Sequence, residues 1–101
     1  NIQIGNVKII PQSHQVFVGE HPLDLLRKEY DILHYFMTRP NHVIDKAVLA
    51  EAVWGDHIDQ VDSFDFIYAQ IKNLRRKLQL AQATLIIKAV YGFGYKLVEI
   101  E

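Results

Sequence analysis

The chain has 101 residues, of which half are hydrophobic and 23% are charged, and it contains no cysteine. These values are typical of one globular domain and exclude a disordered chain, disulfide bonds and thiolate metal sites. No apolar run approaches the roughly 20 residues of a membrane span, so we expect a cytoplasmic domain with no membrane contact. Because the sequence opens at Asn1 directly on a strand pattern, we also expect a piece of a longer protein.

Charge is segregated along the sequence, although the net charge is only −1. Residues 66–98 contain six Lys and Arg side chains and no acid, whereas residues 1–65 contain ten acids and five cations. An approaching polyanion responds to the local field rather than to the average. The nearly neutral total therefore does not exclude nucleic acid as a partner.

Residues 1–25 are predicted to form three or four short antiparallel strands. Apolar side chains alternate there with polar neighbours, which is the period of a half-buried sheet, and turn-forming residues separate the runs. The alternating apolar positions are Ile2, Ile4, Val7, Ile9, Val16, Val18, Leu23 and Leu25.

Two helices are predicted to follow. The first ends at or before Arg39, because Pro40 disfavours helical geometry in the residue that precedes it. The second begins after Asp45, a good N-cap, and ends at Gly55. The expected apolar stripes are Leu26, Tyr30, Ile32, Leu33, Phe36 and Met37 in the first helix, and Val48, Leu49, Ala52 and Val53 in the second.

Residues 62–80 carry the clearest helical pattern, and Asp62 is the expected cap. The opposite face is small in its middle and cationic toward its C-terminal end. Such a face suits nucleic acid, although many helices with a basic face are simply solvated. Large apolar side chains recur at the helical steps of three and four, at Phe64, Ile67, Ile71, Leu74 and Leu78.

The loop before this helix is rich in possible metal ligands. It lacks the central Gly and the terminal Glu of a calcium-binding hand loop, and Asp62 already has a capping role. We therefore predict no metal and no cofactor. The side chains concerned are Asp56, His57, Asp59, Asp62 and Asp65.

Residues 85–100 are predicted to form a hairpin, with a turn at residues 91–94. The Gly92-Phe93-Gly94 sequence lacks the third glycine of a dinucleotide fingerprint, and a strand rather than a helix follows it. The tip of the hairpin is therefore aromatic, and Lys88 and Lys96 stand beside it.

Four segments resemble, in order, the C-terminal effector domain of OmpR/PhoB-type response regulators. They are LLRKEYDILHYFMTRPNHVI, AVLAEAVWG, FIYAQIKNLRRKL and IKAVYGFGYKL. The match runs over nearly the whole chain. The helix ending in I-x-x-L-R-x-K-L and the closing G-x-G-Y-K-L are specific in combination.

The resemblance implies an α+β fold, a winged helix-turn-helix with an N-terminal antiparallel sheet (1–25), a three-helix core (26–80) and a C-terminal hairpin wing (85–100). It implies sequence-specific binding of double-stranded DNA by the output domain of a phosphorylation-controlled transcriptional regulator. The regulator would belong to a two-component system and bind direct-repeat sites as a dimer. An upstream phosphoacceptor domain, absent from this chain, would receive a phosphoryl group from a sensor kinase. Loop 55–61 corresponds to the segment that contacts RNA polymerase in activating members.

By the same resemblance, the helix at 62–80 enters the major groove, and the wing at 91–94 reaches the minor groove or the backbone. Ala69 lets the helix approach base edges, and Asn73 has the donor and acceptor that suit adenine. Lys72, Arg75 and Arg76 suit phosphates, Gln70 suits either, and Trp54 either abuts the DNA backbone or packs beneath the loop. The candidate DNA-binding residues are Trp54, Phe66, Ala69, Gln70, Lys72, Asn73, Arg75, Arg76, Tyr91, Gly92 and Lys96.

Three positions depart from the family pattern. Asp65 stands where many members carry a basic residue, and it would repel phosphate or accept a hydrogen bond from cytosine. Tyr91 replaces a frequent Arg at the wing tip, which removes a cationic minor-groove contact. Leu26 stands where a Thr usually caps the first helix, so we expect another cap, such as Asp24. These departures predict weaker DNA affinity and more dependence on dimerisation.

An alternative function is a winged helix that contacts proteins and has lost its DNA face, as Asp65, Tyr91 and the small net charge suggest. The dependence of DNA affinity on salt separates the two, because each phosphate contact contributes about 0.9 log units to the slope. An enzyme is not indicated, since the sequence has no cysteine, no G-x-S-x-G and no Walker loop, and no paired carboxylates near a His with a shaped pocket implied.

Overall fold

The computed structural model describes residues 1–55 and 64–100. Four short antiparallel strands form the N-terminal sheet in the order β1-β2-β3-β4, and the alternate apolar side chains of the first three strands face the core. The fourth strand is shorter and earlier than predicted, because Pro22 contributes no N–H to the ladder. Leu23 adds one bond to Val16 (2.8 Å), and Leu25 lies outside the strand. The elements are β1 (Ile2–Ile4), β2 (Val7–Ile10), the 3-10 turn η1 (Pro11–Ser13), β3 (Gln15–Val18) and β4 (His21–Pro22).

Helix α1 (Arg27–Met37) buries most of its predicted stripe. Leu26 is the exception, since it is the N-cap residue of α1 and is 61% exposed. The cap does not come from Asp24. Instead, the Glu29 carboxylate accepts a hydrogen bond from the Leu26 N–H (2.8 Å), which is one half of a capping box.

Helix α2 (Lys46–Trp54) has the predicted ends. The Asp45 carboxylate accepts a hydrogen bond from the Ala47 N–H (2.7 Å), and Gly55 closes the helix with φ 70°. Its buried face is narrower than predicted, because Leu49 and its neighbour Ala50 are buried while Val48 is half exposed. A helix of two and a half turns that packs mainly on α1 can bury only one side.

Helix α3 (Asp65–Leu80) begins three residues later than predicted, with Phe64 as its N-cap residue. The expected cap at Asp62 lies outside the described residues. A connector then leads to the hairpin of β5 (Leu85–Val90) and β6 (Gly94–Glu99). A short bridge closes the free edge of β6, because Ile44 and Tyr95 exchange backbone hydrogen bonds of 2.7 and 3.0 Å.

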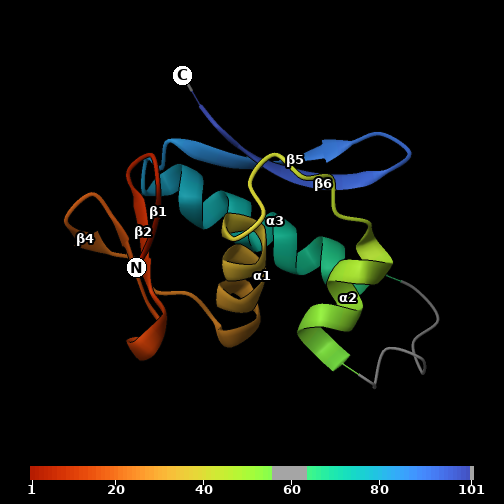
Figure 1. Ribbon diagram of the computed structural model, residues 1–101, viewed down its shortest axis with the longest axis horizontal. Coiled ribbons are helices and arrows are strands. Elements are labelled where there is room, and N and C mark those ends of the chain that lie inside the picture. Colours follow the sequence, from red (N-terminus) through yellow and green to blue (C-terminus); the bar gives the residue numbers. More distant parts are fainter. Residues whose placement is uncertain (56–63, 101) are drawn as a thin grey trace.

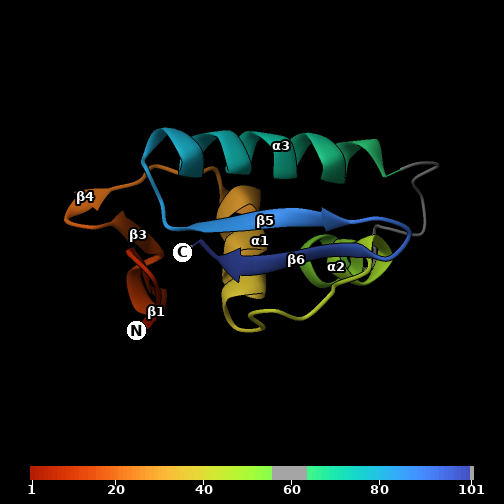
Figure 2. The same cartoon turned by 90° about the horizontal axis from the view of Figure 1, so that it is seen from above.

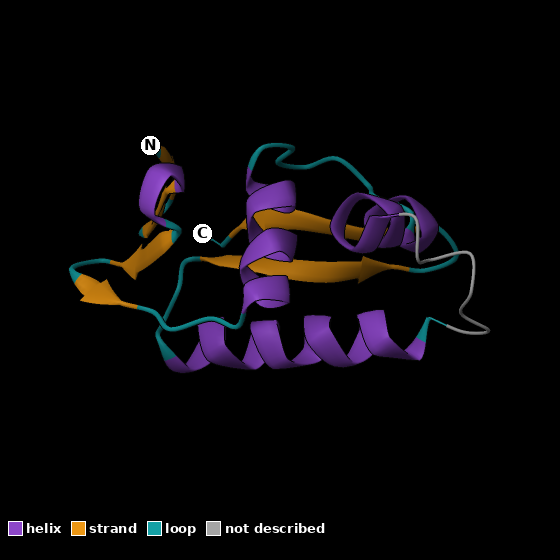
Figure 3. Cartoon of the chain, turned by 90° about the horizontal axis from the view of Figure 1, so that it is seen from below, coloured by secondary structure: helices purple, strands orange, loops and turns teal. Residues whose placement is uncertain are grey.

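The three helices and the hairpin enclose one core, with α1 at its centre (Figure 1). Seen from above, α3 runs alongside β5 (Figure 2). Seen from below, α1 and α2 cover one face of the hairpin (Figure 3). No described element covers the other face (Figure 2). This arrangement confirms the predicted α+β winged helix-turn-helix, and none of the described helices is long and apolar enough to cross a membrane.

Candidate nucleic-acid interface

Helix α3 is divided into a buried face and an exposed face. Ile67, Ile71, Leu74 and Leu78 are buried in the core, as the sequence predicts. The other face exposes the small side chain of Ala69 at its middle. Four polar or charged side chains are exposed with it toward the C-terminal end: Lys72, Asn73, Arg75 and Arg76. The short Ala69 side chain thus lets a partner molecule approach the backbone of α3 closely, and the side chains next to it make this face positively charged.

One cation of α3 does not belong to this exposed face. The Lys77 ammonium donates a hydrogen bond to the buried Glu29 carboxylate (2.6 Å), and two thirds of its side chain is covered. The ion pair joins the C-terminal half of α3 to the first turn of α1. Lys77 therefore anchors the helix and does not add to the free charge of its surface.

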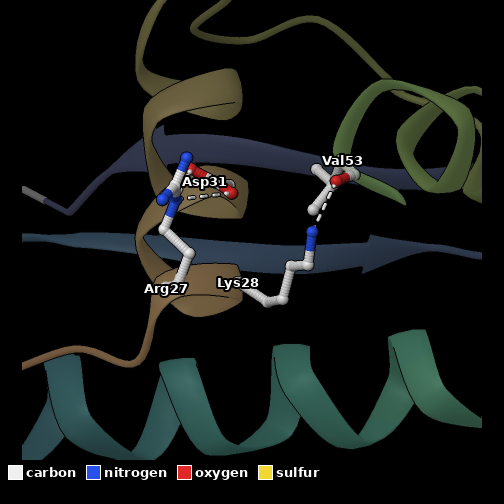
Figure 4. A network of polar contacts seen from close by, with 4 residues as sticks. All are labelled: Arg27, Lys28, Asp31 and Val53. Atoms are coloured by element: carbon white, nitrogen blue, oxygen red, sulfur yellow. Dashed lines mark hydrogen bonds and ion pairs between the residues drawn. The ribbon is translucent and has the colours of Figure 1, made fainter. Parts of the chain in front are cut away.

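Trp54 and Phe66 form the joint between α2 and α3. Their rings meet edge to face, with centroids 4.8 Å apart, and both side chains are half-buried. The Lys28 ammonium lies 5.5 Å from the Trp54 ring centroid and donates a hydrogen bond to the Val53 carbonyl (2.9 Å; Figure 4). Trp54 thus packs against Phe66. Its packing beneath the loop and its contact with the DNA backbone both stay predictions, because residues 56–63 lie outside the described residues.

The wing tip presents two aromatic rings on a glycine-built turn. Tyr91 is 98% exposed and Phe93 is 71% exposed. The Phe93 N–H donates to the Val90 carbonyl (2.9 Å), and Gly92 has φ 80°, a conformation that glycine adopts without steric cost. The predicted turn therefore holds both rings away from the core.

Tyr68 is a candidate that the sequence pattern missed. It is 41% exposed on the N-terminal half of α3. Together with Tyr91 and Phe93 it lines a cavity of about 230 Å³ between α3 and the wing tip. Its spacing of four residues from Lys72 is the signal in the sequence that places it on the exposed side.

Tyr95 lies beside this cavity, with its ring centroid 6.5 Å from that of Tyr68. Burial raises the pKa of the Tyr95 phenol above its ordinary value. The nearby Tyr68 raises this pKa further, and the Arg75 guanidinium lowers it in part. Tyr95 is consequently a neutral group at physiological pH.

The remaining candidates lie around this surface. Gln70 is half-buried, and its Oε1 is buried with no hydrogen-bond partner among the described residues. Lys96 is half-buried on the hairpin. Asp65 is exposed at the start of α3. Within residues 1–55 and 64–100, no group of His, Asp and Glu side chains could hold a metal ion; most of the acidic loop lies outside these ranges.

Comparisons with known proteins agree on one family. Residues 20–97 match the family described as "Transcriptional regulatory protein, C terminal". The phosphate regulon transcriptional regulatory protein PhoB of Klebsiella pneumoniae is 32% identical over 95 residues, which are 94% of this chain and 41% of that protein. The chain thus spans less than half the length of this relative.

Solved structures give the same result. The Klebsiella pneumoniae RstA DNA-binding domain, solved in complex with the RstA box, matches with a TM-score of 0.81 and 28% identity, over 96% of this chain and 95% of that one. The DNA-binding domain of the response regulator AdeR, solved with an intercistronic region, matches with a TM-score of 0.85 over 98% and 99% of the two chains. At 23% identity, AdeR shows the fold alone.

Proposed function

Since the chain belongs to the family of C-terminal domains of transcriptional regulatory proteins, we propose that it binds double-stranded DNA sequence-specifically and regulates transcription. The observation that carries this proposal is the exposed face of α3, where the small Ala69 is followed by exposed Lys72, Asn73 and Arg76. A major groove about 12 Å wide admits one α-helix whose outward side chains reach base edges. The RstA DNA-binding domain, solved in complex with the RstA box, supports DNA as the partner.

We assign the roles on α3 by side-chain chemistry. Ala69 permits close approach and meets a thymine methyl, while Asn73 pairs with adenine through its amide. Lys72, Arg75 and Arg76 bind phosphates and fix the register of the helix on the duplex. Gln70 lies beside them and serves either purpose.

Trp54 and Phe66 support this surface from behind. Their rings are half-buried against each other, so their contribution is to fix the angle between α2 and α3. At the wing, Tyr91 and Gly92 contact the minor groove or the backbone, and Tyr68 faces the DNA between α3 and the wing. Lys96 adds a phosphate contact.

The complete protein is proposed to be a two-component response regulator. PhoB of Klebsiella pneumoniae is more than twice as long as this chain, which leaves room for an upstream phosphoacceptor domain controlled by a sensor kinase. Two copies would bind direct-repeat sites as a dimer, and loop 55–61 would contact RNA polymerase. A regulator of this kind acts where the chromosome is, which in a bacterium is the cytoplasm.

A binding titration against a randomised duplex library tests the proposed function. We expect enrichment of a direct repeat, with an affinity that falls steeply from low to near-physiological salt because phosphate contacts release counterions. A forced dimer of the domain serves as the second sample, since it removes any dependence on the missing upstream domain. A lack of enrichment with both samples would overturn the proposal and favour the protein-binding alternative.

A further inference from the structure

Two lysines stand directly opposite each other on the wing hairpin. In the register of β5 and β6, Lys88 pairs with Lys96. Residues directly opposite across an antiparallel pair point to the same face, and their Cβ atoms are about 5 Å apart. Leu85, Ile87 and Leu97 alternate with the lysines and are buried. Both lysines therefore lie on the uncovered face of the hairpin that Figure 2 shows from the front.

This pair is unfavourable for the folded domain on its own. Like charges directly opposite each other on a sheet destabilise it. Within residues 1–55 and 64–100, neither Lys88 nor Lys96 makes an ion pair. The only acid of the described hairpin, Glu99, pairs with Leu85 and so belongs to the other face. An anion at the lysine pair would relieve the repulsion.

The pair is continuous with the cationic side of α3. Ile86 points to the same face as Lys88, one strand period away. Ile86 and the exposed Arg75 of α3 line the same cavity, of about 370 Å³. Arg75, Lys88 and Lys96 thus form a cationic strip that leads from α3 across β5 to β6.

We propose that this strip binds the DNA backbone beside the groove that α3 enters, and that Lys88 and Lys96 together hold a single phosphate. The inference rests on the proposed function. Two ammonium groups from directly opposite positions converge on one anion, and a phosphodiester of the DNA backbone has two non-bridging oxygens, one for each ammonium. The strip is placed to follow the sugar-phosphate backbone of one DNA strand, because its first member, Arg75, lies on α3, the helix that faces DNA in the proposed function.

The test compares single and double variants on a duplex that carries one half-site, so that only one copy binds. Dissociation constants of Lys88→Gln, Lys96→Gln and the double variant are measured between 50 and 200 mM salt. We expect weaker binding to every sequence. Because one phosphate contact contributes about 0.9 log units to the salt slope, losing it reduces the salt-dependent loss of affinity by roughly threefold over this range. The double variant should lower the slope by about one contact rather than two.

A stability measurement provides a second readout. Removal of either ammonium relieves the like-charge pair, so both single variants should melt at a higher temperature than the wild type while binding DNA less well. Lys8→Gln is the matched control, because Lys8 lies on the N-terminal sheet over the Phe17 ring (5.6 Å). It should leave both the salt slope and half-site affinity unchanged.

Three outcomes would overturn the inference. Unchanged half-site binding by the double variant, with binding lowered by Lys72→Gln, would remove the strip and leave the proposed function intact. A loss confined to cooperative binding on a direct repeat would assign the lysine pair to a second copy of the chain. If the wild type binds neither the half-site duplex nor the direct repeat, the proposed function and the strip fail together.

Discussion

The Glu29 carboxylate on α1 accepts a hydrogen bond from the Lys77 ammonium on α3 over 2.6 Å, and Glu29 is completely buried. The same carboxylate oxygen accepts a hydrogen bond from the Leu26 N–H. One buried side chain thus caps α1 and holds the C-terminal half of α3. The second carboxylate oxygen is also buried and has no partner among the described residues. The hydrogen bonds from the Lys77 ammonium and the Leu26 N–H therefore offset the cost of burying the Glu29 carboxylate.

Removal of Glu29 should therefore be severely destabilising. Glu29→Ala leaves the Lys77 ammonium without its counter-charge and the first turn of α1 without its cap. We expect a loss of roughly 3 kcal/mol in the free energy of unfolding, near the lower limit for a broken buried ion pair because Lys77 is partly solvated. Urea unfolding followed by circular dichroism measures this loss.

The surface ion pair of Arg27 and Asp31 on the same helix is the matched control (Figure 4). Its nitrogen and oxygen are 3.4 Å apart, and the Arg27 side chain is largely exposed. Asp31→Ala should cost at most about 0.5 kcal/mol. Similar losses for Glu29→Ala and Asp31→Ala would contradict the structural role that we give to Glu29.

The ion pair of Glu29 and Lys77 predicts which cations of α3 contribute to the salt dependence of DNA binding. Lys72 is exposed, so Lys72→Ala should weaken binding to all DNA sequences and lower the salt slope by about one unit. Lys77 is neutralised by Glu29, so Lys77→Ala should leave the slope unchanged, provided that the variant is folded under the conditions used. A lower slope for Lys77→Ala would show that Lys77 leaves Glu29 to contact DNA.

The contrast between Lys72 and Lys77 shows what the sequence could and could not predict. Periodicity alone separates the buried Ile71 from the exposed Lys72, because residues three and four apart share one face of a helix. It cannot show that Lys77 is paired, since its partner lies 48 residues away in the chain. The sequence pattern also missed the cap at Glu29. A capping box is recognised by a Ser or Thr at the N-cap position, and the Leu26 side chain there cannot accept a hydrogen bond.

Tertiary packing accounts for the other differences. Leu26 and Val48 have the apolar character and spacing of core residues, yet both are at least half exposed. Helix α1 begins only after Leu26, and α2 packs mainly on one neighbour. Tyr68 lies on the exposed side of α3, and its position near Tyr91 depends on how the wing folds back beside α3. Such proximity is not encoded in either segment alone.

Asn73 provides the test of base reading. It is exposed one turn beyond Ala69, and its amide can make two hydrogen bonds to adenine. Asn73→Ala should cost roughly 1–3 kcal/mol of affinity for the preferred site and relax discrimination at one base position. Selection of the variant against the same randomised library measures this change. An unaltered sequence preference would remove Asn73 from the reading role.

Alkaline pH should weaken the fold through Tyr95. Burial raises the pKa of Tyr95 in the folded state above the ordinary value of 10.0. The contribution of the protonated phenol to the free energy of unfolding is therefore complete below that ordinary value and is lost as pH rises through the folded-state pKa. Tyr95→Phe should show a smaller fall in unfolding free energy between pH 9 and pH 11 than the wild type. The pKa of Tyr30 is also raised by burial, so part of the fall should remain. Equal falls in the two proteins would contradict this assignment.

Gly94 should be the least replaceable glycine of the wing. Its φ is 147°, and a Cβ there would collide with the backbone carbonyl of Ile44. That carbonyl accepts the hydrogen bond from the Tyr95 N–H that attaches β6 to the segment before α2. Gly94→Ala must therefore both strain the backbone and move the bridge, and we expect a loss of about 3 kcal/mol in unfolding free energy.

Gly92 is the matched control for this effect, because it also has a positive φ (80°) but has open space around its Cβ position. Gly92→Ala should cost only the backbone term, about 1–2 kcal/mol. Thermal and urea unfolding of the two variants measure the difference. A larger loss for Gly92→Ala than for Gly94→Ala would mean that the strain of the turn, rather than the bridge to Ile44, fixes the position of the wing beside α3.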